Sequence, residues 1–196
     1  MAAFMPFLLA TGCDMGAPQA NTSSETEPKA SYQAPTDIVF QEIDREGLSE
    51  RAVETLTEIQ EIVETGSLRR LARYADTHSN FTSNFGTEAH YDYWYLLRRT
   101  GAEPLDQLIR IFNEPHGKLT IGDQSWHVWP DFAAIDEDNR NPDRMDINTR
   151  ARLVALIGES GADQMRKGAA YPGVRTAISD DGRWIYWLFE TGETLD

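Results

Sequence analysis

The 196-residue chain contains a single cysteine, Cys13, which limits how any fold that it adopts can be stabilised. One cysteine cannot form an intramolecular disulfide, so it is free, paired with another molecule, bound to a ligand or modified. Packing alone must therefore hold the fold together, even in an oxidising compartment. The composition allows this, because 40% of the residues are apolar, which is enough to fill one core.

A short apolar run precedes the cysteine. Residues 2–10 are apolar, but the run is far shorter than the roughly 20 residues that cross a bilayer. It ends in Leu9-Ala10-Thr11-Gly12-Cys13, which resembles the signal peptide and lipobox of a bacterial lipoprotein. The resemblance implies that residues 1–12 are a cleaved signal peptide and that Cys13 carries acyl chains such as palmitate. Two or more chains give a stable membrane anchor, since each buried methylene contributes about 0.8 kcal/mol.

The same resemblance implies a location in the cell envelope, with the lipid in a membrane and the protein facing the periplasm. Asp14 comes directly after the cysteine and resembles the inner-membrane retention signal of enterobacterial lipoproteins, which slightly favours the inner membrane. The alternative is a cytosolic N-terminus that is apolar by chance, in which Cys13 has no special role.

The residues after the cysteine are distinguished by their charge and composition. The net charge of the chain is −14, which repels nucleic-acid phosphates and anionic lipid headgroups, so we expect no nucleic-acid partner. Residues 14–37 are rich in Ala, Pro, Ser, Thr, Glu and Gln, and this composition predicts a disordered spacer. We therefore expect residues 13–37 to link the lipid to a folded domain at residues 38–196.

Helical periodicity dominates the first part of that domain. Apolar residues recur at helical spacing between the capping residue Ser49 and Gly66, and again after Ser67. Further helices are expected from Thr87 to about Gly101, from Pro104, and from Asp146 or Asn148. In the last of these, the residues expected to face inward are Ala151, Val154, Leu156 and Ile157.

Two segments have the pattern of β-hairpins. Residues 118–129 flank a turn at Gly122-Asp123, and residues 174–189 flank a turn at Asp181-Gly182. The predicted order places helices first and then mixes helices with antiparallel strands. It predicts one α+β domain whose helices pack on a curved antiparallel sheet. This order resembles the NTF2-like cone fold. The chain also resembles exported bacterial proteins of unknown function in the short motifs Phe85-Gly86, Trp129-Pro130 and Asp181-Gly182-Arg183-Trp184.

The C-terminal hairpin supplies the candidate ligand site. A two-residue turn pairs Asp180 with Arg183, which sets the expected register. One face then carries the pairs Thr176–Trp187, Ile178–Ile185 and Val174–Phe189, and is expected to be core. The other face carries Arg175–Leu188, Ala177–Tyr186 and Ser179–Trp184. Aromatic, small and cationic residues are mixed there, as where a sheet borders a cavity. The candidate ligand-binding residues are Arg175, Trp184 and Tyr186, together with His127 and Trp129 on a predicted strand.

Other chemical motifs are weaker. The acidic segment 136–141 would need a glycine where Asn141 stands to form an EF-hand loop, so we expect no metal there. The four histidines lack metal-ligand spacing, Ser160 lacks the second glycine of a nucleophile elbow, and no cofactor is expected. His127 beside a carboxylate such as Asp131 is the best candidate base, although a structural histidine is favoured.

These patterns favour a lipid-anchored binding or interaction domain without catalysis. Its partner would be a small apolar or carbohydrate ligand, or an envelope protein. The first alternative is a small hydrolase or isomerase that uses His127 with a carboxylate, and the second is a structural subunit of an envelope assembly. A reachable His127 would favour the enzyme, and a pocket without ionisable groups would favour ligand binding. A flat aromatic surface without a pocket would favour the assembly subunit.

Lipidation at Cys13 is directly testable. Cells fed a clickable palmitate analogue should label the wild-type protein and not Cys13→Ser, because the thiol is the attachment point, and the variant should keep its signal peptide. Equal labelling of both proteins would contradict the lipoprotein interpretation.

Overall fold

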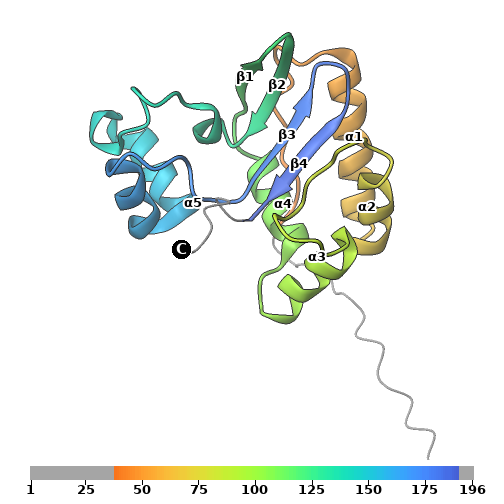
Figure 1. The fold of residues 1–196 in the computed structure, drawn as a ribbon. Helices are drawn as coiled ribbons and strands as arrows, with labels where there is room; N and C mark the ends of the chain where they lie inside the picture. Colours follow the sequence, from red (N-terminus) through yellow and green to blue (C-terminus); the bar gives the residue numbers. More distant parts are fainter. Residues whose placement is uncertain (1–37, 190–196) are drawn as a thin grey trace, which may run out of the picture. The chain divides into compact units, whose positions relative to one another are not determined.

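The computed structural model describes residues 38–189 (Figure 1). The predicted signal peptide, the lipidated Cys13 and the spacer up to residue 37 lie outside these residues. The described residues all belong to one unit, which comprises residues 32–196.

The described chain forms α-helices and an antiparallel sheet, which confirms the predicted α+β class. The α-helices are α1 (Glu50–Glu64), α2 (Leu68–Ala75), α3 (His90–Arg99), α4 (Pro104–Phe112) and α5 (Ile147–Arg166). Two short 3-10 helices are η1 (Asp131–Ala134) and η2 (Pro142–Arg144). The strands are β1 (Gly117–Ile121), β2 (Gln124–Trp129), β3 (Arg175–Ser179) and β4 (Trp184–Leu188). They lie side by side in the order β1-β2-β3-β4, each antiparallel to the next. The NTF2-like cone stays a prediction.

The first two helices begin at the predicted caps. Ser49 Oγ accepts a hydrogen bond from the Ala52 amide at 3.1 Å, and Ser67 Oγ accepts one from the Arg70 amide at 3.2 Å. Each hydroxyl satisfies an amide that the first turn leaves unpaired. Gly66, with φ +68°, lets the chain turn between the two helices.

Two helices differ from the prediction. α3 begins at His90 rather than Thr87, because Ala89 is in an extended conformation and forms the N-cap. α5 continues to Arg166, with a kink at Gly158, where φ is +69°. Its buried residues include Leu153, Ala162 and Met165. Of the residues predicted to face inward, Leu156 and Ile157 pack against the smaller core, Val154 is half-buried and Ala151 is exposed.

The register of the last hairpin matches the prediction at the open end and differs at the turn. Thr176 faces Trp187 and Ala177 faces Tyr186, as predicted. Ile178, however, faces Trp184 instead of Ile185. The Ser179 amide donates to the Arg183 carbonyl oxygen at 2.9 Å, so the loop contains the three residues 180–182 rather than two. The extra residue makes a β-bulge in β4.

This bulge changes which face carries Trp184. Trp184 and Trp187 both lie on the face that packs against the helices, and both are 0% exposed. The predicted pairing of Ser179 with Trp184 on a face bordering a cavity is therefore wrong. The Trp184 indole nitrogen instead donates to Thr176 Oγ1 at 2.7 Å inside the core.

Apolar residues form two separate cores. The main core joins α1, α2, α3 and α4 to one face of the sheet, and its largest buried side chains are Trp94, Trp129, Trp184 and Trp187. A smaller core lies under α5 and consists of Phe132, Leu153, Met165 and Tyr171. In Figure 1, α5 (cyan to blue) lies on the opposite side of the sheet from α1 and α2.

The segment before α1 is bonded to the end of α4. The Asn113 side chain accepts a hydrogen bond from the Gln41 amide at 2.8 Å and donates one to the Val39 carbonyl at 2.9 Å. Ile43 is buried in the main core beside this contact. We call residues 38–43 the strap.

The bulge predicts the stability of three tryptophan variants. Trp184→Ala and Trp187→Ala should each lower the free energy of unfolding by about 3–5 kcal/mol, as large-to-small changes in a core do. The control Trp126→Ala should lower it clearly less, because Trp126 is only half-buried. Denaturant melts measure all three. If Trp184→Ala cost as little as Trp126→Ala, the bulged register would be wrong.

Candidate functional site

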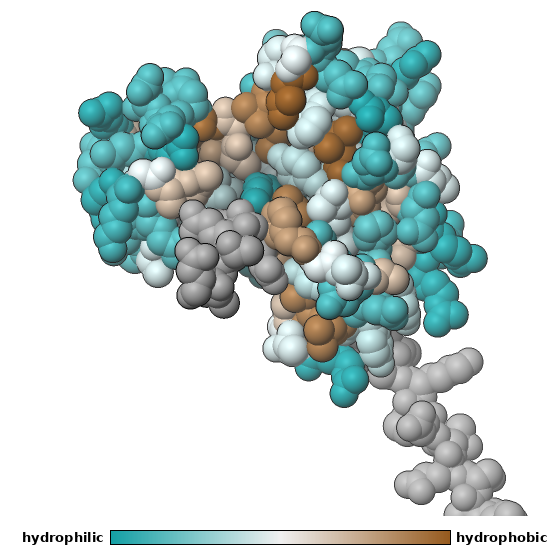
Figure 2. All heavy atoms as spheres, viewed as in Figure 1, coloured by the Kyte–Doolittle hydropathy of each residue, from teal (hydrophilic) through white to brown (hydrophobic). Residues whose placement is uncertain are grey.

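The two faces of the sheet have different environments. The face toward α1–α4 carries His127, Trp129 and Thr176, which are buried. We call the opposite side the outer face, and by register it carries Leu119, Trp126, Tyr186 and Leu188. Figure 2 shows hydrophobic side chains over this side of the sheet, set among polar ones.

The five predicted ligand-binding residues do not form one surface. His127, Trp129 and Trp184 lie in the buried face. Arg175 and Tyr186 lie on the outer face of neighbouring strands. Only these last two therefore remain together on a side of the sheet that the helices of the main core do not cover.

A groove of about 420 Å³ lies at the outer face beside β4. Its floor consists of Trp126, Ile185, Tyr186 and Leu188. Its wall consists of Ser79, Asn80, Thr82 and Phe85, and Arg183 stands at the rim. Phe85 is 56% exposed, which is unusual for a phenylalanine. Phe85 belongs to one of the short motifs in the sequence, but neither it nor the rest of this wall was predicted to form a site.

The wall is fixed by backbone bonds to β4. The Thr82 amide donates to the Ile185 carbonyl at 3.1 Å, and the Trp187 amide donates to the Thr82 carbonyl at 2.9 Å. Asn80 has φ +63°, a left-handed conformation in which asparagine is common. The segment thus covers part of the edge of β4 and forms one side of the groove.

Hydrogen bonds also hold the rim. Arg183 Nη2 donates to Gln124 Oε1 at 2.9 Å, and its Nε donates to Asp181 Oδ2 at 2.9 Å. The Trp126 indole nitrogen reaches the same Gln124 oxygen at 3.4 Å. Arg183 and Trp126 are therefore linked through one glutamine.

The Tyr186 phenol on the floor is neutral at pH 7. Burial raises its pKa to about 12, although the nearby Arg175 guanidinium acts in the opposite direction. A neutral phenol can both donate and accept a hydrogen bond. The groove thus contains a polar group among its aromatic rings.

The best candidate base on the opposite face, His127, has a carboxylate partner that was not predicted. Its Nε2 lies 2.6 Å from Asp180 Oδ1, and since a carboxylate can only accept, Nε2 carries the proton. Asp131, the predicted partner, instead accepts two hydrogen bonds from Arg152 at 2.9 and 2.6 Å.

The His127–Asp180 pair is closed to substrate. His127 is 1% exposed, its Nε2 is occupied, and its Nδ1 is buried without a partner among residues 38–189. The neighbouring backbone is bonded to α1, because Ser49 Oγ donates to the Asp180 carbonyl at 2.7 Å and Thr55 Oγ1 donates to the Gly182 carbonyl at 2.6 Å. The pair therefore holds the β3–β4 turn against β2, and the two hydroxyls hold it against α1.

A second histidine cluster also has the elements of a catalytic relay. Ser83 Oγ lies 2.7 Å from His90 Nδ1, and His90 Nε2 lies 3.8 Å from Asp76 Oδ1. Ser83 is only 1% exposed, and its oxygen accepts a hydrogen bond from the Asn84 amide group at 3.1 Å. The hydroxyl faces the protein, so this cluster orders the start of α3 rather than presenting a nucleophile.

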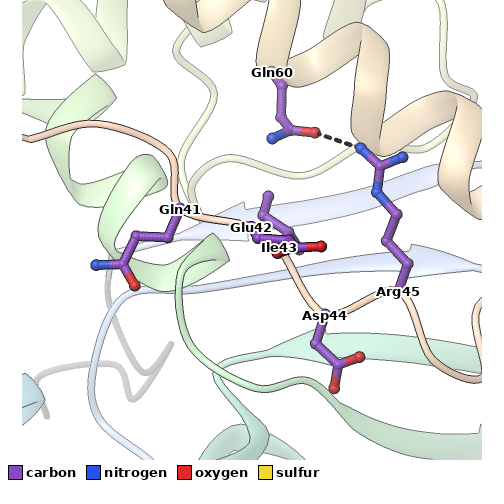
Figure 3. A pocket seen from close by; sticks show the side chains of 6 residues that line it. All are labelled: Gln41, Glu42, Ile43, Asp44, Arg45 and Gln60. Carbon is purple, nitrogen blue, oxygen red and sulfur yellow. Dashed lines mark hydrogen bonds between the residues drawn. The ribbon is translucent and has the colours of Figure 1, made fainter.

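The strap borders another cavity, of about 570 Å³. Figure 3 shows Arg45 hydrogen-bonded to Gln60, while Gln41 and Asp44 point away from this pair and from each other. Polar side chains that diverge do not form a binding constellation. We therefore place the candidate site at the groove beside β4.

Two further properties concern membranes and metals. No helix within residues 38–189 is both long and apolar enough to cross a membrane. The same residues contain no cluster of three or more His, Cys, Asp or Glu side chains that could hold a metal ion. In the acidic segment, Asp136 instead accepts hydrogen bonds from Asn139.

The His127–Asp180 pair predicts a pH effect on stability. Partial burial raises the Asp180 pKa, but the His127 hydrogen bond and the Lys118 charge outweigh it, so the pKa lies below its usual value. A lowered pKa stabilises the fold above the unfolded pKa of about 3.9, and this contribution disappears as the pH falls through the folded pKa. Asp180→Asn should therefore be less stable than wild type by about 1 kcal/mol at pH 5, a value kept small because the carboxylate is 42% exposed.

Denaturant melts between pH 5 and pH 2.5 would measure the effect. The difference between wild type and Asp180→Asn should shrink toward the acid end of this range. The control Asp123→Asn, in the exposed β1–β2 turn, should show no comparable change. A difference for Asp180→Asn that did not vary with pH would contradict this role.

No protein-family model, curated protein or solved structure matches the chain.

Proposed function

We propose that this chain is a lipid-anchored domain of the cell envelope that faces the periplasm and binds a ligand or partner without catalysis. The anchor is Cys13, and its support is the lipoprotein-like sequence that ends there. The binding surface is the groove beside β4, and its support is the geometry of the outer face.

One contrast carries the proposal. The groove exposes aromatic rings at the surface, whereas both histidine clusters have their reactive atoms turned inward. A partner that covers Trp126 and Phe85 removes their apolar surface from water, which favours binding. Such residues are common at the centres of binding sites. A surface built in this way favours binding over chemistry.

A structural role in an envelope assembly is the second candidate. The specific observation in its favour is that Leu96 and Ile121 are also exposed, on α3 and β1, outside the groove. Exposed apolar residues of this size can extend a protein interface. The enzyme alternative has less support, because the structure gives His127 a carboxylate but no access.

Photo-crosslinking in a Gram-negative host tests the binding surface. The full-length protein would carry a photo-reactive amino acid in place of Phe85 and, as the matched control, in place of Ile147, which is 82% exposed on α5. We expect a discrete adduct from position 85 that the control does not give. Adding Trp126→Ala should abolish it, because the groove floor is then lost.

The anchor is tested in the same experiment. Cys13→Ser should weaken the adduct if the partner is held at the membrane. Identical adducts from positions 85 and 147, or an adduct that persists in Trp126→Ala, would contradict the groove as the binding surface.

A further inference from the structure

We infer that the groove beside β4 binds a neutral saccharide chain, with sugar rings against Trp126 and Tyr186 and sugar hydroxyls bonded to Asn80 and its neighbours. This inference rests on the proposed function, since it names the ligand of the same surface. It depends on three properties of the lining: its aromatic rings, its polar groups and its charge.

The aromatic rings suit the apolar side of a sugar. A pyranose presents C–H groups on its faces and hydroxyls around its edge. Trp126 and Tyr186 come from different strands, their ring centroids are 6.2 Å apart and their planes meet at 66°. Both are only half-buried, and Phe85 stands exposed on the wall. The floor thus has two rings at an angle, which suits consecutive sugar units better than one flat ligand.

The polar groups suit the hydroxyl edge of a sugar. Within the described part of the chain, the Ser79 hydroxyl and the Asn80 amide make no side-chain hydrogen bond, so both are available to a ligand. Tyr186 adds a neutral phenol. An entirely apolar ligand would cover these groups without satisfying them, which is unfavourable.

The charge of the lining selects a neutral ligand. Arg183 is the one charged residue among the nine that line the groove, and Asp181 lies 2.9 Å from its Nε. A cationic ligand would find no carboxylate in the lining. An anionic ligand would be repelled by the net charge of −14. A neutral chain with many hydroxyls avoids both penalties.

Titration of the mature, lipidated protein in lipid nanodiscs tests the inference. The probes are the neutral oligosaccharides maltohexaose, cellohexaose and chitohexaose, at up to millimolar concentration, with binding followed by calorimetry and tryptophan fluorescence. We expect at least one to bind with a Kd in the micromolar to millimolar range, which is about −8 to −4 kcal/mol.

Variants locate the binding. Trp126→Ala and Asn80→Gly should each weaken it about tenfold or more, and glycine keeps the positive φ of residue 80 while removing the amide. The matched control Ile147→Ala, on α5, should bind as wild type does. Thermal melts of the same samples show whether each variant is folded, and a folded Asn80→Gly that bound as wild type would overturn the assigned contact.

The remaining outcomes separate this inference from the proposed function. If no saccharide binds but the neutral dye Nile red does, in a way that depends on Trp126, the groove is a binding site and the saccharide inference is overturned. If acidic polygalacturonate binds as tightly as the neutral chains, selection of a neutral ligand is overturned. If neither saccharide nor dye binds and the Phe85 probe gives no groove-dependent adduct, both proposals fail.

Discussion

The turn between β3 and β4 determines how the rest of the domain packs. It contains one residue more than the shortest hairpin loop, and β4 accommodates the difference as a bulge before Tyr186. Trp184 and Trp187 consequently point to the same side and form the centre of the main core. The turn is fixed from two directions, by His127 of β2 and by the hydroxyls of Ser49 and Thr55 at α1. These polar contacts hold the turn whose register places both tryptophans against the helices.

The groove is a consequence of how the edge of β4 is protected. An unpaired edge strand can recruit another chain, and proteins often cover such edges with a loop. Here the loop around Thr82 does so with two backbone bonds, and it brings Asn80 and Phe85 to the margin of the outer face. The bulge buries Trp184 but does not change the pairing of Tyr186 with Ala177, so Tyr186 stays on the groove floor. The loop that protects the edge of β4 therefore also forms one side of the groove.

Local patterns predicted the elements well, and non-local geometry limited the prediction of the site. Ser49 and Ser67 identified helix starts because capping is a property of a few adjacent residues. A turn at Asp181-Gly182 was visible, but loops of two and three residues share that sequence and differ by one register step, which moves side chains to the other face. Asp131 was expected beside His127 because it is close in sequence, whereas the actual partner is 53 residues away. The groove wall was missed for the same reason, since it meets β4 about a hundred residues later.

The hydrogen bonds of Asn113 determine where a force on the strap enters the domain. In the lipid-anchored protein that we propose, any tension between the membrane and a bound partner enters the domain at its N-terminal side. Asn113 bonds both Val39 and Gln41, and Ile43 is buried just beyond them, so the load passes to the end of α4. The path to α4 does not run through β4 or the turn that positions the tryptophans. A pull on the tether therefore loads the Asn113 hydrogen bonds and the buried Ile43 before it reaches β4.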